Sequence, residues 1–292
     1  MTLETLAALI RCPECLADFT PSPGGLSCAS CGSQPEVAGR QIRLGPSPPG
    51  AVPSVRKERG LGKGSPFRRA NWAFYGAAAE EVAEGATVLD IGAGHGDLAP
   101  LFTRTTYVAC DVMPYQEVHL IGDIVTCPFL RPASADAVLL SNVLEHLTAP
   151  IETLTAIARA LRPGHGRVYV AVPFLIKLHQ TPIDYHRYTH YMLVEMCRQA
   201  GLRIVRIEAV YAPFFMLRVA IDNVLATIAA SGRGRLLEAS AGRLLKLAPR
   251  VLRRGSGVDD TEVVAASDGG DLPDRGRHAY PLGYQIVLAR RD

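Results

Sequence analysis

A strand-like run that ends in a glycine-rich turn is the feature that most constrains the fold of this chain. The strand-like residues 87–91 lead into Gly92, Gly94 and Gly96, and residues 97–102 are compatible with a helix. Glycines let the backbone approach a ligand closely, and open α/β sheets bind ligands at the carboxyl ends of their strands. This segment therefore predicts the first strand and the ligand-binding turn of such a sheet. The turn alone does not select the ligand, because nicotinamide-dependent enzymes share it.

Short β-rich runs recur after this turn, and helical patterns lie between them. The clearest helical pattern covers residues 151–161, where apolar residues share one face and Pro163-Gly164 ends the helix. Strands that alternate with helices predict a doubly wound, mostly parallel α/β sheet. We expect this domain to span residues 71–292, with a helical and disordered insertion at about 213–277. The predicted strands are residues 87–91, 107–110, 137–140, 167–172, 203–210 and 284–289.

Acidic residues near the turn separate the possible ligands. A dinucleotide-binding turn requires a small residue at position 97, near the pyrophosphate, but this chain has Asp97 there. Asp90, just before the turn, is suited to a cationic ligand end. Asp111 ends the next strand, where a carboxylate can accept both hydroxyls of a ribose. The later Gly122-Asp123-Ile124 segment can place a carboxylate or a backbone group against an adenine edge.

Four cysteines near the N-terminus form two Cys-x-x-Cys pairs. Cys12 pairs with Cys15, Cys28 pairs with Cys31, and twelve residues separate the two pairs. Two such turns supply the four thiolates of a closed tetrahedral zinc site, which holds a fold together without doing chemistry. We therefore expect residues 1–45 to form a zinc ribbon whose core is too small to fold without its metal.

A segment rich in proline, glycine and basic residues follows the predicted ribbon. We expect residues 46–70 to form a flexible linker that keeps the core of the ribbon separate from the main core. The basic residues of the linker are interpreted as solvated, with a phosphate-contacting arm as the alternative. Buried thiols are expected for the remaining cysteines, which are Cys110, Cys127 and Cys197.

Five landmarks occur in one order along the chain: the glycine-rich turn, Asp111, the 122–124 segment, Asn-Val-Leu-Glu-His-Leu at 142–147 and Ala-Leu-Arg-Pro-Gly at 160–164. With these landmarks, residues 71–211 and the last strand resemble a class I, type 11 methyltransferase that depends on S-adenosylmethionine. Such a domain has a seven-stranded sheet. The N-terminal segment resembles the Trm112-like zinc ribbons, which occur beside or fused to methyltransferases.

The resemblance also implies how the cofactor is held. The methionine part would lie against Asp90, Gly92, Ala93 and Gly94, and the ribose against Asp111. The adenine would lie against Asp123 and Ile124, and the sulfonium beside Ser141 and Asn142. His165 departs from the family pattern, which has a second glycine after Pro163-Gly164. That departure affects only a turn.

The Glu145-His146 pair follows the predicted strand at 137–140, at the mouth of the expected site. For a hydroxyl acceptor, methyl transfer needs a group that removes the proton. His146 is either such a base or a structural residue, because Leu-Glu-His is common in the family whatever the substrate. O-methyltransferases of the ubiquinone pathway resemble this stretch and bind a metal through the acid–histidine pair and a further acid. Asn142 replaces that acid here, which argues against metal-assisted catalysis.

A second polar cluster, at residues 179–189, follows the next predicted strand. It resembles a segment that covers the acceptor pocket in methyltransferases of surface-glycan biosynthesis. His179, His186 or His146 is the expected base, and Arg187 is expected to bind an anionic or hydroxylated acceptor. The alternative interpretation is a hydrogen-bonded loop that caps a helix.

Composition and charge limit the partners. The net charge of +3 does not by itself indicate a nucleic-acid or anionic-membrane partner. The favoured function is O-methylation of a sugar or another small biosynthetic metabolite. The ribbon and the basic linker keep an RNA methyltransferase open as an alternative, and a non-catalytic cofactor-binding module is a second one.

Neither a signal peptide nor a run long and apolar enough to span a membrane occurs in the sequence, so we expect a cytoplasmic protein. Apolar faces at residues 214–252 lie within the insertion and are interrupted by basic residues. A lid over the acceptor pocket is the favoured interpretation of this stretch. A dimer interface and a peripheral membrane contact are the alternatives.

Overall fold

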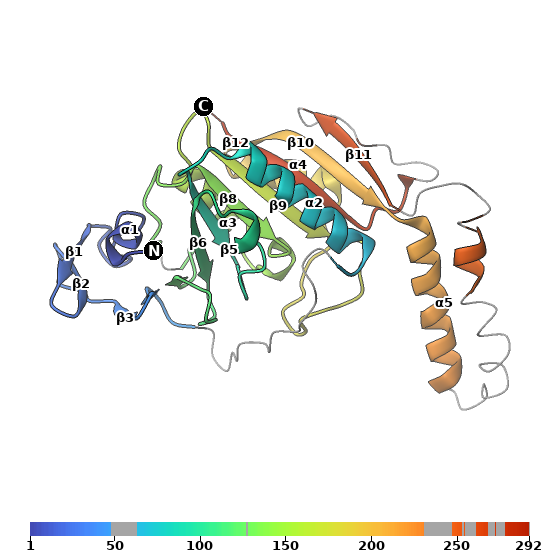
Figure 1. Ribbon diagram of the computed structural model, residues 1–292, viewed down its shortest axis with the longest axis horizontal. Coiled ribbons are helices and arrows are strands. Elements are labelled where there is room, and N and C mark those ends of the chain that lie inside the picture. Colours follow the sequence, from blue (N-terminus) through green and yellow to red (C-terminus); the bar gives the residue numbers. More distant parts are fainter. Residues whose placement is uncertain are drawn as a thin grey trace.

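The computed structural model describes residues 1–47, 63–126, 128–230, 247–252, 254, 261–267, 272 and 278–291. A mixed sheet runs through the molecule, and its described strands have the order β11-β10-β12-β9-β8-β5-β6-β7-β4-β3 (Figure 1). The strands are β1 (Phe19–Ser22), β2 (Gly25–Cys28), β3 (Glu36–Ala38), β4 (Gln41–Arg43), β5 (Thr87–Ile91), β6 (Thr106–Asp111), β7 (Leu120–Ile121), β8 (Ala137–Ser141), β9 (Arg167–Pro173), β10 (Leu202–Tyr211), β11 (Glu262–Ser267) and β12 (Gly283–Arg290). The helices are α1 (Leu3–Ala7), α2 (Pro66–Glu81), α3 (Pro150–Ala160), α4 (His190–Gln199) and α5 (Pro213–Ala230), with 3-10 turns η1 (Ala99–Leu101) and η2 (Leu144–His146).

The centre of the sheet is parallel. Strands β7, β6, β5, β8 and β9 pair in parallel with their neighbours, and β12 lies antiparallel between β9 and β10. These seven strands confirm the predicted doubly wound, mostly parallel fold. Three further strands widen the sheet: β3 and β4 come from the N-terminal segment, and β11 comes from the insertion.

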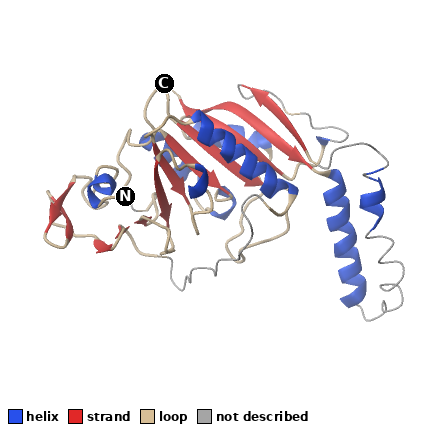
Figure 2. Ribbon diagram, in the orientation of Figure 1, coloured by secondary structure: helices blue, strands red, loops and turns tan. Residues whose placement is uncertain are grey.

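Alternation along the central strands divides the apolar side chains between two cores. Leu89 and Leu140 face a core that includes residues of α3 and α4, whereas Val88 and Leu139 face a core that includes residues of α2. Helices accordingly lie on both sides of the sheet in Figure 2. A strand that is covered on both faces reads as a continuous apolar run, which is why residues 137–140 were recognisable as a strand.

The N-terminal segment is built into the main sheet. Strand β4 pairs in parallel with β7, so that Ile42 lies opposite Leu120. Ile10 and Ile42 are fully buried and belong to the same core cluster as Leu120. The backbone N–H of Arg11 donates to the carbonyl of Phe129 over 2.8 Å. The expectation that the linker separates two cores is therefore wrong for the described residues.

The glycine-rich turn does not lead into the helix predicted at 97–102. Only the 3-10 turn η1 forms there, with the N–H of Ala99 donating to the carbonyl of Gly96 over 3.1 Å. Pro100 has no N–H and cannot close an α-helical hydrogen bond to Gly96. The apolar spacing of this segment was thus a poor guide to its backbone.

The described part of the insertion contains helix α5 and strand β11. Strand β11 pairs antiparallel with β10, so the expectation of disorder in the insertion, which applied to its polar tract at 255–277, is wrong for residues 262–267. Helix α5 follows β10, and its Phe215 and Met216 pack against a cluster that Ile176 also contacts. The rest of α5 extends away from the sheet (Figure 1). In the described part of the chain, no helix has the length and apolarity to cross a membrane.

Several expectations fall on residues outside the described part. These are residues 48–62 of the linker expected at 46–70, the buried thiol of Cys127, residues 231–246 of the stretch at 214–252 and most of the polar tract at 255–277. The end of the expected linker is wrong, because residues 66–70 form the first part of helix α2.

Candidate functional site

The glycine-rich turn follows β5, and hydrogen bonds to β6 fix its start. The N–H groups of Gly92 and Ala93 both donate to the carbonyl of Cys110, over 2.8 and 3.1 Å. Gly92 has a φ of 72°, and a Cβ atom there would lie 2.6 Å from Cγ2 of Val143. Gly94 has a φ of 54°, yet a Cβ atom there would meet no described atom within 4 Å. Gly92 is therefore needed for close packing, whereas Gly94 borders open space that a ligand can occupy.

Asp111, the last residue of β6, is tied to this turn. Its Oδ2 accepts a hydrogen bond from the N–H of Gly94 over 2.9 Å, and its Oδ1 accepts one from the N–H of Met113 over 2.8 Å. Burial raises the pKa of this carboxyl. Each oxygen has a second lone pair, so the carboxylate can still accept two hydroxyl hydrogen bonds.

Asp90 lies on β5 and is 2% exposed. The hydroxyl of Tyr107 on β6 donates a hydrogen bond to Oδ2 of Asp90. Burial raises the pKa of Asp90 to about 7, despite this hydrogen bond. A cationic group placed beside it would favour the carboxylate and lower that pKa.

The remaining predicted cofactor residues follow β7 and β8. Oδ1 of Asp123 accepts a hydrogen bond from the N–H of Val125 over 2.9 Å, and Ile124 is buried. Ser141 ends β8, and Asn142 follows it with a left-handed φ of 56°. Because β5 to β8 run parallel, the fold brings all the predicted cofactor residues to one edge of the sheet.

The N-terminal segment reaches this edge. A Cβ atom on Gly122 would lie 3.3 Å from the backbone nitrogen of Gly45. The N–H of Leu44 donates to the carbonyl of Ile121 over 2.8 Å. The turn expected to bind adenine therefore packs directly against the end of the ribbon.

Glu145, His146 and His179 form a cluster beyond the ends of β8 and β9. Nε2 of His146 lies 3.7 Å from Oε1 of Glu145, and Nε2 of His179 lies 3.6 Å from the same oxygen. Glu145 is fully buried, and neither of its carboxylate oxygens has a hydrogen-bond partner among the described residues. The Glu145 side chain is the main cause that raises the pKa of His179. The cluster thus combines a buried acid with two imidazoles.

Asp184 and Arg187 orient His179. Oδ2 of Asp184 lies 3.2 Å from Nδ1 of His179. Nη1 and Nη2 of Arg187 donate to the two oxygens of Asp184 over 2.6 and 2.8 Å, and this pairing holds the pKa of Asp184 well below its usual range. Arg187 also donates to the carbonyls of Ile176 and His186. These contacts let Arg187 position His179 through Asp184, and its expected contact with the acceptor stays a prediction.

Asp184 contacts the cluster although the sequence analysis did not name it as a site residue, and His186 lies apart from the cluster although the sequence analysis named it. Asp184 was not among the candidates, although its place three residues before Arg187 was a usable signal. His186 lies outside the cluster, because its Nε2 pairs with the carbonyl of Leu147 over 3.1 Å. His186 also stacks on Tyr188, with ring centroids 5.1 Å apart.

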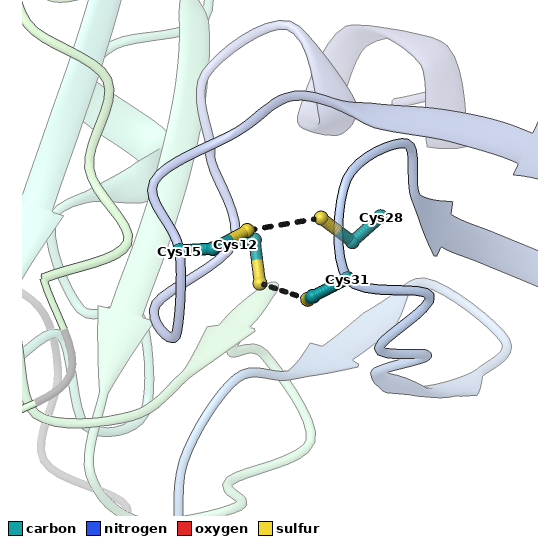
Figure 3. A group of neighbouring side chains, drawn as sticks. All are labelled: Cys12, Cys15, Cys28 and Cys31. Carbon is teal, nitrogen blue, oxygen red and sulfur yellow. Dashed lines mark hydrogen bonds between the residues drawn. The ribbon is translucent and has the colours of Figure 1, made fainter.

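The four N-terminal cysteines converge on one point (Figure 3). Sγ of Cys12 lies 3.6 Å from Sγ of Cys31, and Sγ of Cys15 lies 3.4 Å from Sγ of Cys28. The two turns have the same backbone hydrogen bond, from the N–H of Leu16 to the carbonyl of Cys12 and from that of Gly32 to Cys28. Leu16 and Gly32 both have positive φ values, of 64° and 74°. The cluster is consistent with a zinc ribbon.

Comparison with known families gives one match. Residues 68–207 match the family described as a methyltransferase domain. This segment contains all the predicted cofactor residues and the Glu145–His146–His179 cluster. No curated protein matches the chain in sequence.

Solved structures of methyltransferases are similar to parts of the chain. One is a chain in the complex between the Haloferax volcanii Trm112 methyltransferase activator and a methyltransferase. Its sequence is 28% identical to this chain, the match covers 52% of this chain and 80% of that chain, and the TM-score is 0.40. A sarcosine dimethylglycine methyltransferase from Galdieria sulphuraria is 15% identical, with coverage of 77% and 85% and a TM-score of 0.44. The 1,6-didemethyltoxoflavin-N1-methyltransferase of Burkholderia thailandensis is 23% identical, with coverage of 49% and 70% and a TM-score of 0.39.

Proposed function

We propose that this S-adenosylmethionine-dependent methyltransferase, whose methyltransferase domain covers residues 68–207, methylates a hydroxyl group of a small acceptor. A sugar or a related biosynthetic metabolite is the acceptor class that we favour.

The Glu145–His146–His179 cluster carries this proposal. A hydroxyl is a poor nucleophile until it loses its proton, whereas the methyl group of a sulfonium is already activated. A fully buried carboxylate within 3.7 Å of two imidazole nitrogens provides a place for that proton to go. Glu145 and His146 follow β8, which is the strand next to β5, so an acceptor bound beside them would face the glycine-rich turn.

The cofactor is assigned to the edge formed by β5 to β8. We propose that Asp111 accepts the ribose hydroxyls, that the turn at 92–94 holds the methionine part, and that Asp90 faces its cationic end. Asp123 and Ile124 would border the adenine, and Ser141 and Asn142 the sulfonium. The open space at Gly94 and the free lone pairs of Asp111 support this assignment.

We also propose that Cys12, Cys15, Cys28 and Cys31 bind one structural zinc ion. Four thiolates complete a tetrahedral shell, so the metal would have no open position for substrate. Because β4 extends the main sheet, this zinc would stabilise the adenine side of the cofactor site as well as the ribbon.

Transfer of a labelled methyl group tests the acceptor class. The chain is incubated with S-adenosylmethionine labelled in its methyl group and with an extract of the source organism, which is then separated into RNA, protein and small molecules. We expect the label in the small-molecule fraction. Label confined to RNA or to protein would contradict the proposal. His165→Ala is a matched control, because its exposed ring pairs with Asp136, which lies near the opposite ends of the strands.

A further inference from the structure

We propose that Glu145, His146 and His179 bind one divalent transition-metal ion, for which Zn²⁺ is the best fit. Two imidazole nitrogens and one carboxylate oxygen are the protein ligands of many catalytic zinc sites, which keep a further position open. The ligand atoms of these three residues lie within 4.8 Å of one another. This site is distinct from the four-cysteine cluster, whose ligands are all sulfur.

The spacing of the ligand atoms fits a single ion. Ligand atoms at about 2.1 Å from a tetrahedral ion stand about 3.4 Å apart. Oε1 of Glu145 lies 3.7 Å from Nε2 of His146 and 3.6 Å from Nε2 of His179. Both distances are close to the spacing that a single tetrahedral ion requires.

Unsatisfied polar atoms point to the same ion. Glu145 is 0% exposed, and within the described residues neither of its oxygens, nor Nε2 of His146, has a hydrogen-bond partner. A buried carboxylate without hydrogen bonds is costly, and native structures rarely leave such a group unpaired. A cation between these atoms would satisfy all of them at once.

The outer nitrogens of both histidines are held as metal ligands require. Nδ1 of His146 lies 2.8 Å from the carbonyl oxygen of Ile183, which can only accept, so Nδ1 carries the hydrogen and Nε2 keeps its lone pair. Nδ1 of His179 lies 3.3 Å from the carbonyl oxygen of Lys177 and 3.2 Å from Oδ2 of Asp184, which both only accept, so it too carries its hydrogen, and Arg187 fixes Asp184. Carbonyl or carboxylate partners behind ligating histidines are a regular feature of metal sites.

With this ligand set, Asn142 no longer argues against a metal ion, although it stands where related O-methyltransferases have an acidic metal ligand. The third ligand is His179, which comes from the loop after β9, and an acid at position 142 is not needed. An ion in this position would polarise an acceptor hydroxyl, and because both imidazole nitrogens would then be ligands, the proton would pass to solvent water instead of to them. That catalytic role rests on the proposed O-methylation, whereas binding of the ion does not.

Titration with Co²⁺, a spectroscopic substitute for Zn²⁺, tests the site. The full-length chain with zinc in its ribbon is titrated, and visible absorption and calorimetry are recorded. We expect one Co²⁺ to bind per chain, with visible bands and without the near-ultraviolet charge-transfer bands that thiolate ligands produce. No binding, or a thiolate-type spectrum, would overturn the proposal.

Variants identify the ligands. His179→Ala and Glu145→Gln should each abolish Co²⁺ binding, whereas His165→Ala should bind it normally. Asp184→Asn should bind it about 10–100-fold more weakly, because it weakens the support of His179. Binding of S-adenosylhomocysteine by each variant shows that the fold is intact. Equal Co²⁺ affinity of His179→Ala and the parent chain would refute the site, whereas Co²⁺ binding without O-methyl product would refute only the proposed function.

Discussion

The carboxylate of Asp111 and the backbone N–H of Gly94 lie 2.9 Å apart and are joined by a hydrogen bond. The acid at the end of β6 therefore fixes the turn after β5, while the turn holds the carboxylate in place. A ligand that contacts both would meet a preformed site. The two residues are 17 positions apart, and the parallel pairing of β5 with β6 brings them together.

Asp111→Ala should weaken binding of S-adenosylmethionine strongly. The variant leaves two ribose hydroxyls poorly paired and frees the glycine turn, a loss of about 1.5–3 kcal/mol in binding free energy. Calorimetry measures the change. Glu152→Ala, which removes an exposed acid from α3, is the control and should bind normally. Unchanged affinity in Asp111→Ala would contradict the assigned ribose contact.

Alanine substitutions at Gly92 and Gly94 should have different effects. Both residues have positive φ, so each substitution strains the backbone by about 1–2 kcal/mol. Gly92→Ala should also displace Val143, whose Cγ2 would lie 2.6 Å from the new Cβ, and should lower the melting temperature further. Gly94→Ala has room for its methyl group in the free protein and should mainly obstruct the cofactor. Thermal unfolding with and without S-adenosylhomocysteine separates the two effects, and equal behaviour of the variants would count against this distinction.

Binding of S-adenosylmethionine should release a proton and weaken as the pH falls. The pKa of Asp90 is raised to about 7 by burial in the free protein, and a cationic ligand would favour the carboxylate. Protonated Asp90 therefore competes with the ligand below pH 7, and affinity should fall about tenfold between pH 8 and pH 6. Calorimetry in buffers of different ionisation enthalpy measures the proton release. Asp90→Asn should remove it, and proton uptake by the parent chain would show that the sign is wrong.

Cys28→Ser should affect both the ribbon and the cofactor site. Loss of one thiolate should release the zinc, and β4 would then no longer be held against β7 beside Gly122. We expect one fewer zinc per chain by metal analysis and weaker binding of S-adenosylhomocysteine. Ser30→Ala, an exposed change between Cys28 and Cys31, should alter neither. Normal cofactor affinity in a Cys28→Ser chain without zinc would show that the ribbon is energetically independent.

Local patterns were enough to predict the central fold and the two cysteine pairs. Strand β8 has a nearly continuous apolar sequence because both of its faces are covered, and the two Cys-x-x-Cys turns bring four sulfur atoms together. The edges of the sheet could not be predicted in this way. Strands β4 and β7 contain three and two residues, too few for any periodicity, so their pairing depends on tertiary contacts.

The sequence order was enough to predict that Glu145 and His179 lie near each other, but not which side chains surround them. The parallel pairing of β8 with β9 brings Glu145 and His179 to one edge, as the sequence order implies. The pairing of Arg187 with Asp184 depends on how the loop at 179–189 folds. The sequence alone does not show that the guanidinium of Arg187 is paired with this carboxylate. The same folding separates His186 from the other histidines.

The identity of the methylated atom tests the central proposal most directly. S-adenosylmethionine with a ¹³C-labelled methyl group is incubated with the small-molecule extract and the chain, and carbon chemical shifts distinguish O-methyl from N-, S- or C-methyl groups. We predict an O-methyl product that His165→Ala still forms and that His179→Ala does not. An N- or C-methyl product, or an O-methyl product formed equally well by His179→Ala, would contradict the assignment of the Glu145–His146–His179 cluster to a hydroxyl acceptor.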